Sequence, residues 1–169
     1  MTRALIISDS HGLTSEILSV RDRENADYMI HCGDSELDAD ADELDQFYVV
    51  GGNCDFDDRY PTEQTLTING VTFCVVHGHL HQVKSNLLTL GYRAKELGAQ
   101  VICFGHTHIA GAEQVESQLF INPGSIRLPR GRKEATYAIM EWETSSNITV
   151  SFYEESGEPI TELFYNASF

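Results

Sequence analysis

The chain has 169 residues, 41% of them hydrophobic, which suits one compact core, so we expect a single domain over residues 1–169. Its 26 acidic and 11 basic side chains give a formal net charge of −15, which opposes loose electrostatic binding to nucleic acid or to an anionic membrane. No apolar run approaches the roughly 20 residues of a membrane-spanning helix, the N-terminus lacks a signal-peptide pattern, and the four cysteines lack CxxC spacing, so we expect a cytoplasmic protein with reduced thiols.

Short apolar runs in the first two thirds of the chain have the length and composition of buried β-strands. Two segments with mostly helical spacing of apolar residues separate some of them, at residues 13–24 and 86–97. Strands that alternate with helices predict an α/β fold of right-handed βαβ units around a largely parallel sheet. The apolar runs cover residues 4–8, 28–30, 47–50, 71–76 and 101–104.

The remaining segments carry other patterns. Residues 65–73 alternate around Asn69-Gly70, a strong signal for a β-hairpin. The acidic stretch of residues 36–45 predicts a short solvated helix. Three β-like segments follow His108, and we expect them to form a second sheet; they cover residues 114–121, 136–142 and 148–153.

Each of the five apolar runs ends directly in residues that can bind a metal ion. In open α/β sheets ligands bind beyond the carboxyl ends of the strands, so these side chains should meet at one edge of the sheet. Any one of the motifs alone is typical of a turn or a helix cap, whereas five in succession predict a metal site. The candidate ligands are Asp9, His11, Asp34, Asn53, His77, His106 and His108.

The chemistry of these ligands narrows the choice of metal. They offer oxygen and nitrogen atoms without a thiolate cluster, which favours Mn²⁺ and leaves Fe²⁺, catalytic Zn²⁺ or Ni²⁺ as alternatives. Seven ligands exceed the need of one ion, so we expect two divalent metal ions with Asp34 as the shared carboxylate. Such a pair holds a hydroxide that attacks phosphorus in line, which predicts phosphoryl-transfer chemistry. A Gly-x-Ser-x-Gly elbow is absent, so we expect no covalent phosphoenzyme.

The order of the motifs resembles the calcineurin-like metallophosphoesterases, and the small size resembles their YfcE-type phosphodiesterase branch. Asn122-Pro-Gly-Ser125 extends the resemblance over nearly the whole chain. It implies a four-layer αββα sandwich with the metal site at the C-terminal ends of the strands, and a binuclear phosphodiesterase acting on a small phosphorylated substrate. It also implies that Asp9, His11, Asp34 and His108 hold one metal, and that Asp34, Asn53, His77 and His106 hold the other.

One position departs from the larger members of that superfamily, which carry His where this chain has Cys54. A thiol is a poorer general acid, so the departure implies a preference for phosphodiesters and good leaving groups. Water or His79 would then protonate the leaving group, or the metals would stabilise it in place of an acid, and His79 is also close enough to His77 in sequence to touch the substrate. The alternative is that Cys54 only fills space in its loop.

Several further residues keep two interpretations. Asn53 and Arg127 are candidates for binding the substrate phosphate, as is Arg130, although both arginines also fit simple surface positions. His31 either orients the Asp34 carboxylate or is a buried structural histidine.

Two other functions compete with the hydrolase. One is a non-catalytic, protein-binding scaffold like the small retromer subunit, which the complete ligand set disfavours. The other is a nuclease, which the net charge and the absence of a basic stripe disfavour. Assembly into a homo-oligomer stays open.

Overall fold

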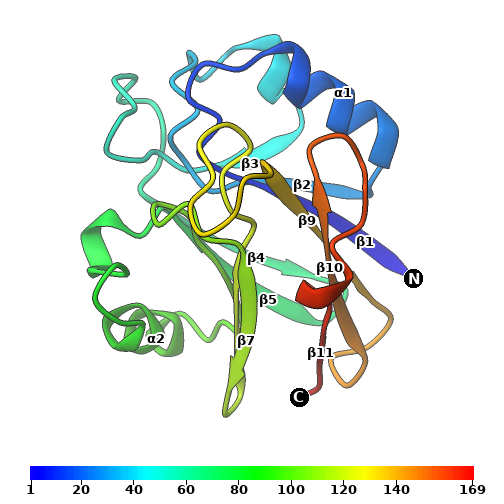
Figure 1. Cartoon of the computed structure of the whole chain (residues 1–169). Coiled ribbons are helices and arrows are strands. Elements are labelled where there is room, and N and C mark those ends of the chain that lie inside the picture. Colours follow the sequence, from blue (N-terminus) through cyan, green and yellow to red (C-terminus); the bar gives the residue numbers. More distant parts are fainter.

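The computed structural model describes residues 1–169 as eleven strands and two α-helices, with the strands in two sheets (Figure 1). The first sheet has the order β11-β10-β9-β1-β2-β3, and the second has the order β4-β5-β6-β8-β7. The strands of the first sheet are β1 (Thr2–Ile7), β2 (Tyr28–His31), β3 (Phe47–Val49), β9 (Thr136–Trp142), β10 (Ile148–Glu154) and β11 (Tyr165–Ala167). Those of the second sheet are β4 (Glu63–Ile68), β5 (Val71–Val76), β6 (Val101–Cys103), β7 (Gly111–Val115) and β8 (Gln118–Asn122).

The first helix, α1 (Ser15–Glu24), covers the outer face of the first sheet. Successive side chains of a strand point to opposite faces, and β1 shows this plainly. Leu5 and Ile7 pack in the cluster beneath α1, whereas Ala4 and Ile6 pack in the core between the two sheets. Burial on both faces explains why the β1 sequence is an almost continuous apolar run.

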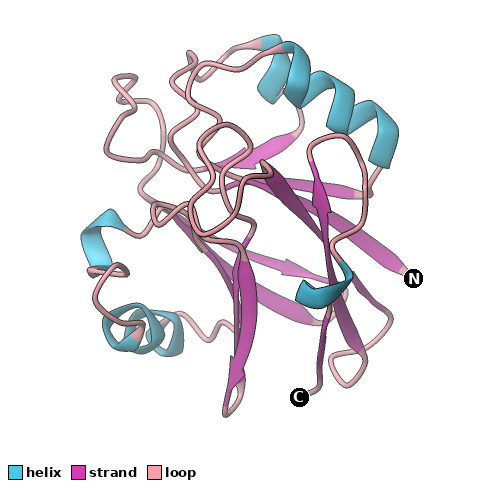
Figure 2. Ribbon diagram, viewed as in Figure 1, coloured by secondary structure: helices cyan, strands magenta, loops and turns pink.

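The second helix, α2 (Leu88–Glu96), covers the outer face of the second sheet through Leu90 and Ala94. Figure 2 shows the two helices on opposite sides of the molecule with the sheets between them. Across the central core, Phe73 of β5 and Trp142 of β9 pack with their ring centroids 5.5 Å apart. The predicted four-layer αββα sandwich is therefore confirmed. No helix combines the length and the apolar character that crossing a membrane requires.

The strands are divided between the sheets differently from the prediction. β5 and β6 do not extend the sheet of β1, β2 and β3; with β8 they form the parallel centre of the second sheet. β9 and β10 join the first sheet instead, with β9 antiparallel to β1. Side-chain alternation shows which faces of a strand are buried but not which neighbour completes its hydrogen bonds, so the predicted pairing was wrong.

The predicted helix in residues 36–45 was also wrong. That stretch is a loop with one 3₁₀ turn at Asp42–Leu44. Glu36 has a φ of 55°, outside the helical range, and the Leu37 carbonyl, which a helix would pair with a later N–H group, accepts from the Tyr60 hydroxyl at 2.7 Å. The backbone N–H of Ala39 also donates to the Asp57 carboxylate at 2.8 Å, so the next loop holds this segment.

Two hairpins test the turn signals in the sequence. The hairpin predicted around Asn69-Gly70 is confirmed, as the connection between β4 and β5. Residues 114–121 were predicted as one strand, but the segment is a second hairpin, β7–β8, which turns at Glu116-Ser117. Glu116 has a φ of 54° without glycine, asparagine or proline beside it, so Ser117 was the only turn residue in the sequence to indicate this connection.

The carboxyl ends of the parallel strands of both sheets meet at one end of the sandwich, where Figure 2 shows loops gathered. The backbone N–H of Asp9, after β1, donates to the carbonyl of Gly33, after β2, at 3.0 Å. Nδ1 of His77, after β5, donates to the carbonyl of Cys32 at 2.7 Å and joins the two sheets. The candidate ligands thus converge from two sheets rather than from one.

Candidate metal centre

Asp9 lies at the middle of the cluster and is fully buried. Its Oδ2 accepts hydrogen bonds from Ser8 Oγ at 2.6 Å and from the backbone N–H of His106 at 3.1 Å. Its Oδ1 makes no hydrogen bond, yet lies near Nε2 of three histidines: His108 at 3.1 Å, His11 at 3.8 Å and His77 at 3.8 Å. Burial would raise the pKa of Asp9, but the neighbouring His108, His77 and Ser8 outweigh it and the net shift is downward.

Asp34 follows β2 and faces His77. The Asp34 Oδ2 atom is 3.2 Å from Nε2 of His77, and its Oδ1 accepts from the backbone N–H of Cys54 at 2.8 Å. Burial opposes the charged form of Asp34, but the His77 interactions and the Cys54 amide hold its pKa well below the usual range. The Asp34 side chain is therefore an ionised carboxylate at neutral pH.

Three histidines share an arrangement that leaves Nε2 facing the cluster. In each, Nδ1 donates to an oxygen on the far side of the ring, which fixes both the tautomer and the orientation. Nδ1 of His77 donates to the Cys32 carbonyl at 2.7 Å, that of His108 to the Leu128 carbonyl at 2.7 Å, and that of His11 to the Glu36 carboxylate at 2.6 Å.

The residues present fit bound cations. Nε2 of His77, like Oδ1 of Asp9, is buried without a hydrogen-bond partner, and an uncompensated buried polar atom is costly. A divalent cation would satisfy both atoms. Two of the three groups of possible ligand atoms that lie within 4.8 Å of one another consist of candidate ligands alone. One is Asp9, His11 and His108, and the other is Asp9, Asp34 and His77. The two groups share Asp9, while the bridging role assigned to Asp34 stays a prediction.

The other two candidate ligands lie beside these groups. The His106 ring is 5.1 Å from the His77 ring and 6.2 Å from the His79 ring, centroid to centroid. Burial and the charges of His77 and Lys84 lower the pKa of His106 to about 4, so its ring is neutral at pH 7. Asn53 is exposed, and its amide donates to Cys54 Sγ at 3.6 Å. Metal binding by both residues stays a prediction.

The backbone is strained at this cluster. Five of the seven candidate ligands have positive φ values, a conformation that is uncommon for residues other than glycine. They are Asp9 at 54°, His11 at 41°, Asp34 at 58°, His106 at 69° and His108 at 62°. Such strain costs of the order of 1 kcal/mol per residue and persists only where the surrounding fold enforces it.

Two glycines let the carboxylates fit. A Cβ atom added at Gly52 would lie 2.1 Å from Asp34 Oδ1, and one added at Gly105 would lie 2.5 Å from Asp9 Oδ2. Neither glycine has a positive φ, so the backbone conformation does not require glycine at these positions. A side chain at Gly52 would collide with the Asp34 carboxylate, and one at Gly105 would collide with the Ser8 hydroxyl and the Asp9 carboxylate.

Sequence reasoning missed two residues that hold the loops in place. The Asp55 carboxylate accepts from the backbone N–H groups of Asp34 at 2.8 Å, Glu36 at 2.8 Å and Gly52 at 2.7 Å. Ser125 Oγ donates to the Asp9 carbonyl at 2.7 Å. Asp55 directly follows Asn53 and Cys54, and Ser125 ends the Asn122-Pro-Gly-Ser125 motif, so their places beside predicted site residues were the available signal.

His31 ties two ligand loops together without touching the Asp34 carboxylate. Its Nδ1 accepts from the backbone N–H of Gly33 at 3.0 Å, and its Nε2 donates to Ser10 Oγ at 2.8 Å. Burial lowers the pKa of His31 to about 4, which keeps the ring neutral. Of the two interpretations, the structural one describes its contacts.

Cys54 and the arginines lie at the open side. Cys54 Sγ is within 4.8 Å of ligand atoms of His11 and Glu36, and burial together with the nearby Asp34 raises its thiol pKa to about 11. The Arg127 guanidinium donates to the His11 carbonyl, so it supports a ligand loop. The backbone N–H of Arg130 donates to the His108 carbonyl at 2.9 Å.

A sandwich of this kind with a histidine and carboxylate cluster at its strand ends defines a class, the metallophosphoesterases, and comparisons with known proteins agree. The family model of the calcineurin-like phosphoesterase superfamily domain matches residues 2–145. The chain therefore belongs to the calcineurin-like phosphoesterase superfamily. Membership implies a hydrolase of phosphate esters that uses divalent metal ions.

Individual relatives span nearly the whole chain. The probable metallophosphoesterase YsnB of Bacillus subtilis is 52% identical over 161 residues, covering 94% of this chain and 95% of YsnB. The phosphodiesterase YfcE of Escherichia coli is 26% identical over 180 residues, covering 89% of this chain and 94% of YfcE.

Solved structures share the fold. A predicted phosphoesterase of Streptococcus pneumoniae superposes with a TM-score of 0.94 at 34% identity, over 99% of this chain and 98% of that one. Vps29 of Entamoeba histolytica in complex with Zn²⁺ superposes with a TM-score of 0.78 at 18% identity, over 99% of both chains. The second likeness concerns the fold alone.

Proposed function

We propose that the protein hydrolyses phosphodiesters with two bound divalent cations, Mn²⁺ being the first choice. The observation that carries the proposal is the pair of buried atoms without partners, Asp9 Oδ1 and His77 Nε2, in the middle of a cluster of carboxylates and imidazoles. Native proteins rarely leave such atoms unsatisfied, and a cation satisfies both at once.

The chain's own groups have separate parts in this reaction. Asp9, Asp34 and the Nε2 atoms of His11, His77 and His108 hold the charge of the site in a fixed geometry. When bound, the cations would neutralise phosphate oxygens and make a water-derived nucleophile available near pH 7. Asn53, exposed at the mouth of the site, would donate its amide to a phosphate oxygen.

The preference for diesters rests on position 54. Monoester hydrolysis with a poor leaving group needs a strong proton donor, and a cysteine thiol is a weaker donor than a protonated histidine. YfcE, the Escherichia coli relative, is named a phosphodiesterase. A diester with a good leaving group needs less protonation, so Cys54 suits that substrate class.

The test compares two substrates with the same leaving group, bis(4-nitrophenyl) phosphate and 4-nitrophenyl phosphate. Metal-stripped protein should be inactive, Mn²⁺ should restore turnover with about two ions per chain, and the diester should react faster. The Cys54→His variant should raise monoester turnover relative to diester turnover. Full activity after stripping, or no turnover of either ester by the reconstituted protein, would contradict the proposal.

The alternative is a non-catalytic scaffold. The fold is shared with Vps29, and one Vps29 structure holds Zn²⁺, so metal binding alone does not separate an enzyme from a scaffold. Turnover does separate them, because a scaffold would bind the metals and hydrolyse neither ester.

A further inference from the structure

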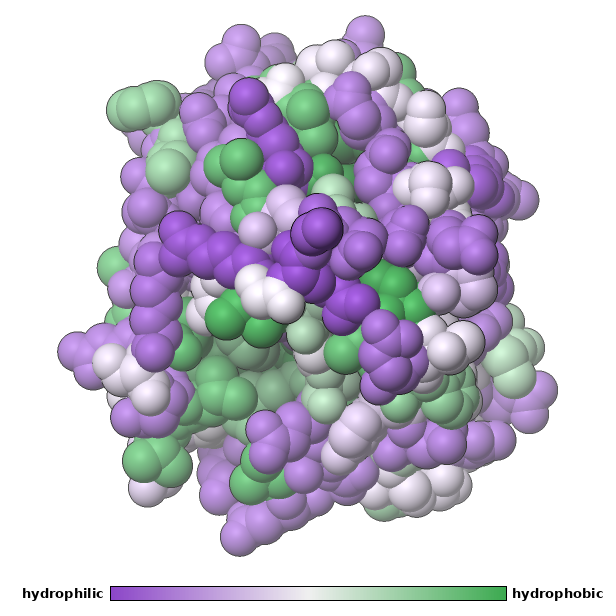
Figure 3. All heavy atoms as spheres, viewed as in Figure 1, coloured by the Kyte–Doolittle hydropathy of each residue, from purple (hydrophilic) through white to green (hydrophobic).

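A pocket of about 460 Å³ opens between the loop that precedes α2 and the β7–β8 hairpin. Figure 3 shows apolar side chains gathered in a hollow there, bordered by hydrophilic side chains. Seven of its thirteen lining residues are hydrophobic, among them Val83, Leu87, Phe104 and Phe120. A volume within the range of about 300–1,000 Å³ and a mostly apolar wall are typical of sites for small organic molecules.

One end of the pocket lies beside the loop that carries two of the candidate ligands, although no candidate ligand lines the pocket itself. Thr107, between the candidate ligands His106 and His108, lines the pocket. Its Oγ1 accepts from the Asn122 amide at 2.9 Å, so the wall next to the ligands is held in place. An ester whose phosphate lies at the metal centre would enter the pocket past Thr107.

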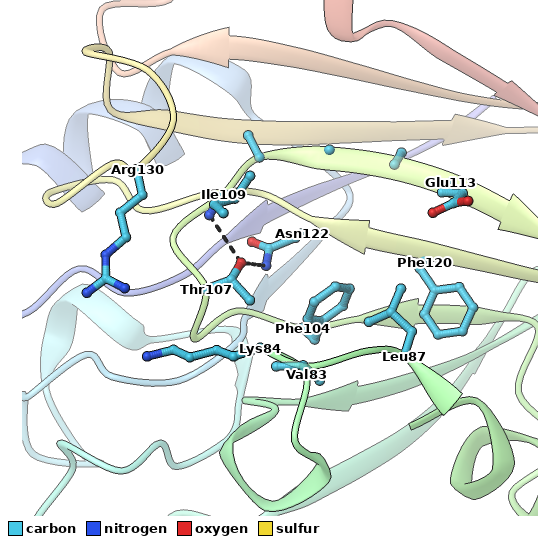
Figure 4. A pocket seen from close by; sticks show the side chains of 13 residues that line it. Val83, Lys84, Leu87, Phe104, Thr107, Ile109, Glu113, Phe120, Asn122 and Arg130 are labelled. Carbon is cyan, nitrogen blue, oxygen red and sulfur yellow. Dashed lines mark hydrogen bonds between the residues drawn. The ribbon is translucent and has the colours of Figure 1, made fainter. Parts of the chain in front are cut away.

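Two cationic side chains mark the same end. Figure 4 shows Lys84 and Arg130 extending on one side of the pocket, beside Thr107, while Glu113 lies near Phe120 toward the opposite end. Lys84 and Arg130 belong to none of the ion pairs of this chain, which is also true of Arg23, Lys95, Arg127 and Lys133. Lys84 and Arg130 are the two of these cations that line the pocket, where they are available to pair with an anion.

We propose that this pocket binds the organic group of the substrate, an apolar aromatic or alkyl group esterified to phosphate. Lys84 and Arg130 face the phosphate oxygens, and Glu113 at the far end disfavours a second anionic group there. The charged residues thus set the orientation of the substrate, and the apolar wall sets the selectivity for its organic group. The inference rests on the proposed phosphoesterase function and names the substrate class for the same site.

Gly111 of β7 provides a direct test, because a Cβ atom added there meets nothing within 4 Å. A Gly111→Leu substitution should fill the pocket without displacing its wall. The probes are 1-naphthylphosphonate and methylphosphonate, which carry the same head group and are not hydrolysed. Their dissociation constants are measured by calorimetry on the Mn²⁺-loaded protein, so the readout does not depend on turnover.

In the unmodified protein the naphthyl compound should bind at least about tenfold more tightly than the methyl compound, because its ring is removed from water. Gly111→Leu should abolish this difference. The matched control is Thr67→Leu, which adds a similar side chain at an exposed position of β4 outside the pocket, and it should preserve the difference. Equal binding of the two probes, or a tenfold difference that survives in Gly111→Leu, would overturn the proposal.

A second variant tests the charged end. Lys84→Met should weaken both phosphonates by about two- to fivefold, because exposed charge pairs contribute little. Lys95→Met removes the same charge from α2 outside the pocket and should leave both unchanged. Equal effects of the two variants would overturn the proposal that Lys84 faces the phosphate oxygens. Intact naphthyl selectivity in a protein that hydrolyses no phosphate ester would overturn the proposed function while supporting the pocket.

Discussion

The hydrophobic core, which lies between the two sheets, and the metal centre, which lies at the strand ends, differ in backbone geometry and in how well their atoms are paired. In the core, Phe73 and Trp142 are fully buried among apolar side chains on strands of regular pairing. At the centre, five residues other than glycine have positive φ values, and two buried polar atoms lack partners. The core stabilises the fold, whereas the centre is a strained region that the fold holds in place. Substitutions in the two regions should therefore affect different properties.

The largest expected effect comes from Asp9→Asn. It should reduce metal-dependent turnover by about a thousandfold or more, since the carboxylate shared by both ligand groups is lost. The stability of the metal-free protein should not fall, because the new amide can donate to a histidine Nε2 that has no partner. Elemental analysis and turnover assays measure the loss of metal and of activity, and thermal melting of the metal-free protein measures its stability. A large loss of metal-free stability would contradict the contrast between the regions.

Phe73→Ala should give the reverse result. Truncating this buried ring should lower the free energy of unfolding by about 3–5 kcal/mol, through lost burial and the cavity that remains. Metal content of the fraction that stays folded should be unchanged. Urea unfolding measures the loss, and a parallel loss of metal from folded protein would show that the two regions are coupled.

Gly52→Ala should act on the centre through one methyl group. The added Cβ atom would lie 2.1 Å from Asp34 Oδ1, so the carboxylate must move and turnover should fall by about ten- to a hundredfold. Gly70→Ala is the control for turnover and metal binding, because the same methyl group meets nothing within 4 Å there and the β4–β5 turn lies outside the metal centre and the pocket. Metal titrations and steady-state kinetics compare the two variants. Equal kinetics would show that the close approach to Asp34 does not matter.

The smallest expected effect is on the pH dependence of the free energy of unfolding, through His31. Its folded-state pKa of about 4 lies below the unfolded value of about 6.5, so the unfolded chain binds the extra proton in that window. Stability contributed by the neutral ring is complete above pH 6.5 and is lost as the pH falls toward 4. His31→Gln should reduce this loss by of the order of 1 kcal/mol, measured by urea unfolding at pH 7, 6 and 5. An unchanged pH dependence would assign the loss to other groups.

Much of the fold followed from local patterns. The apolar runs became strands, the helical spacings became α1 and α2, and Asn69-Gly70 became a hairpin, because each depends on residues close in the chain. The β7–β8 turn and the loop at residues 36–45 escaped prediction. The β7–β8 turn depends on the positive φ of Glu116. The loop at residues 36–45 depends on hydrogen bonds with side chains of another loop, such as Asp57.

The candidate site divided in the same way. The residue types Asp9, His11, Asp34, His77 and His108 could be selected from the sequence, since each ends a buried strand. The residues that hold the ligand loops in place could not be selected, because Asp55 and Ser125 bind backbone groups that lie beside them only after folding. The apolar pocket is also built from segments distant in sequence, and no single motif encodes it.

The sequence by itself determined the identity and order of the ligand types and the strands that carry them, because alternation and turn chemistry are local properties. Only the tertiary structure decided that these strands belong to two sheets whose carboxyl ends meet. Only that meeting places Oδ1 of Asp9 near three imidazoles and His77 against the Cys32 carbonyl. The physical reason is that strand pairing and sheet packing are settled by hydrogen bonds and burial between residues far apart in the chain, which no local pattern records.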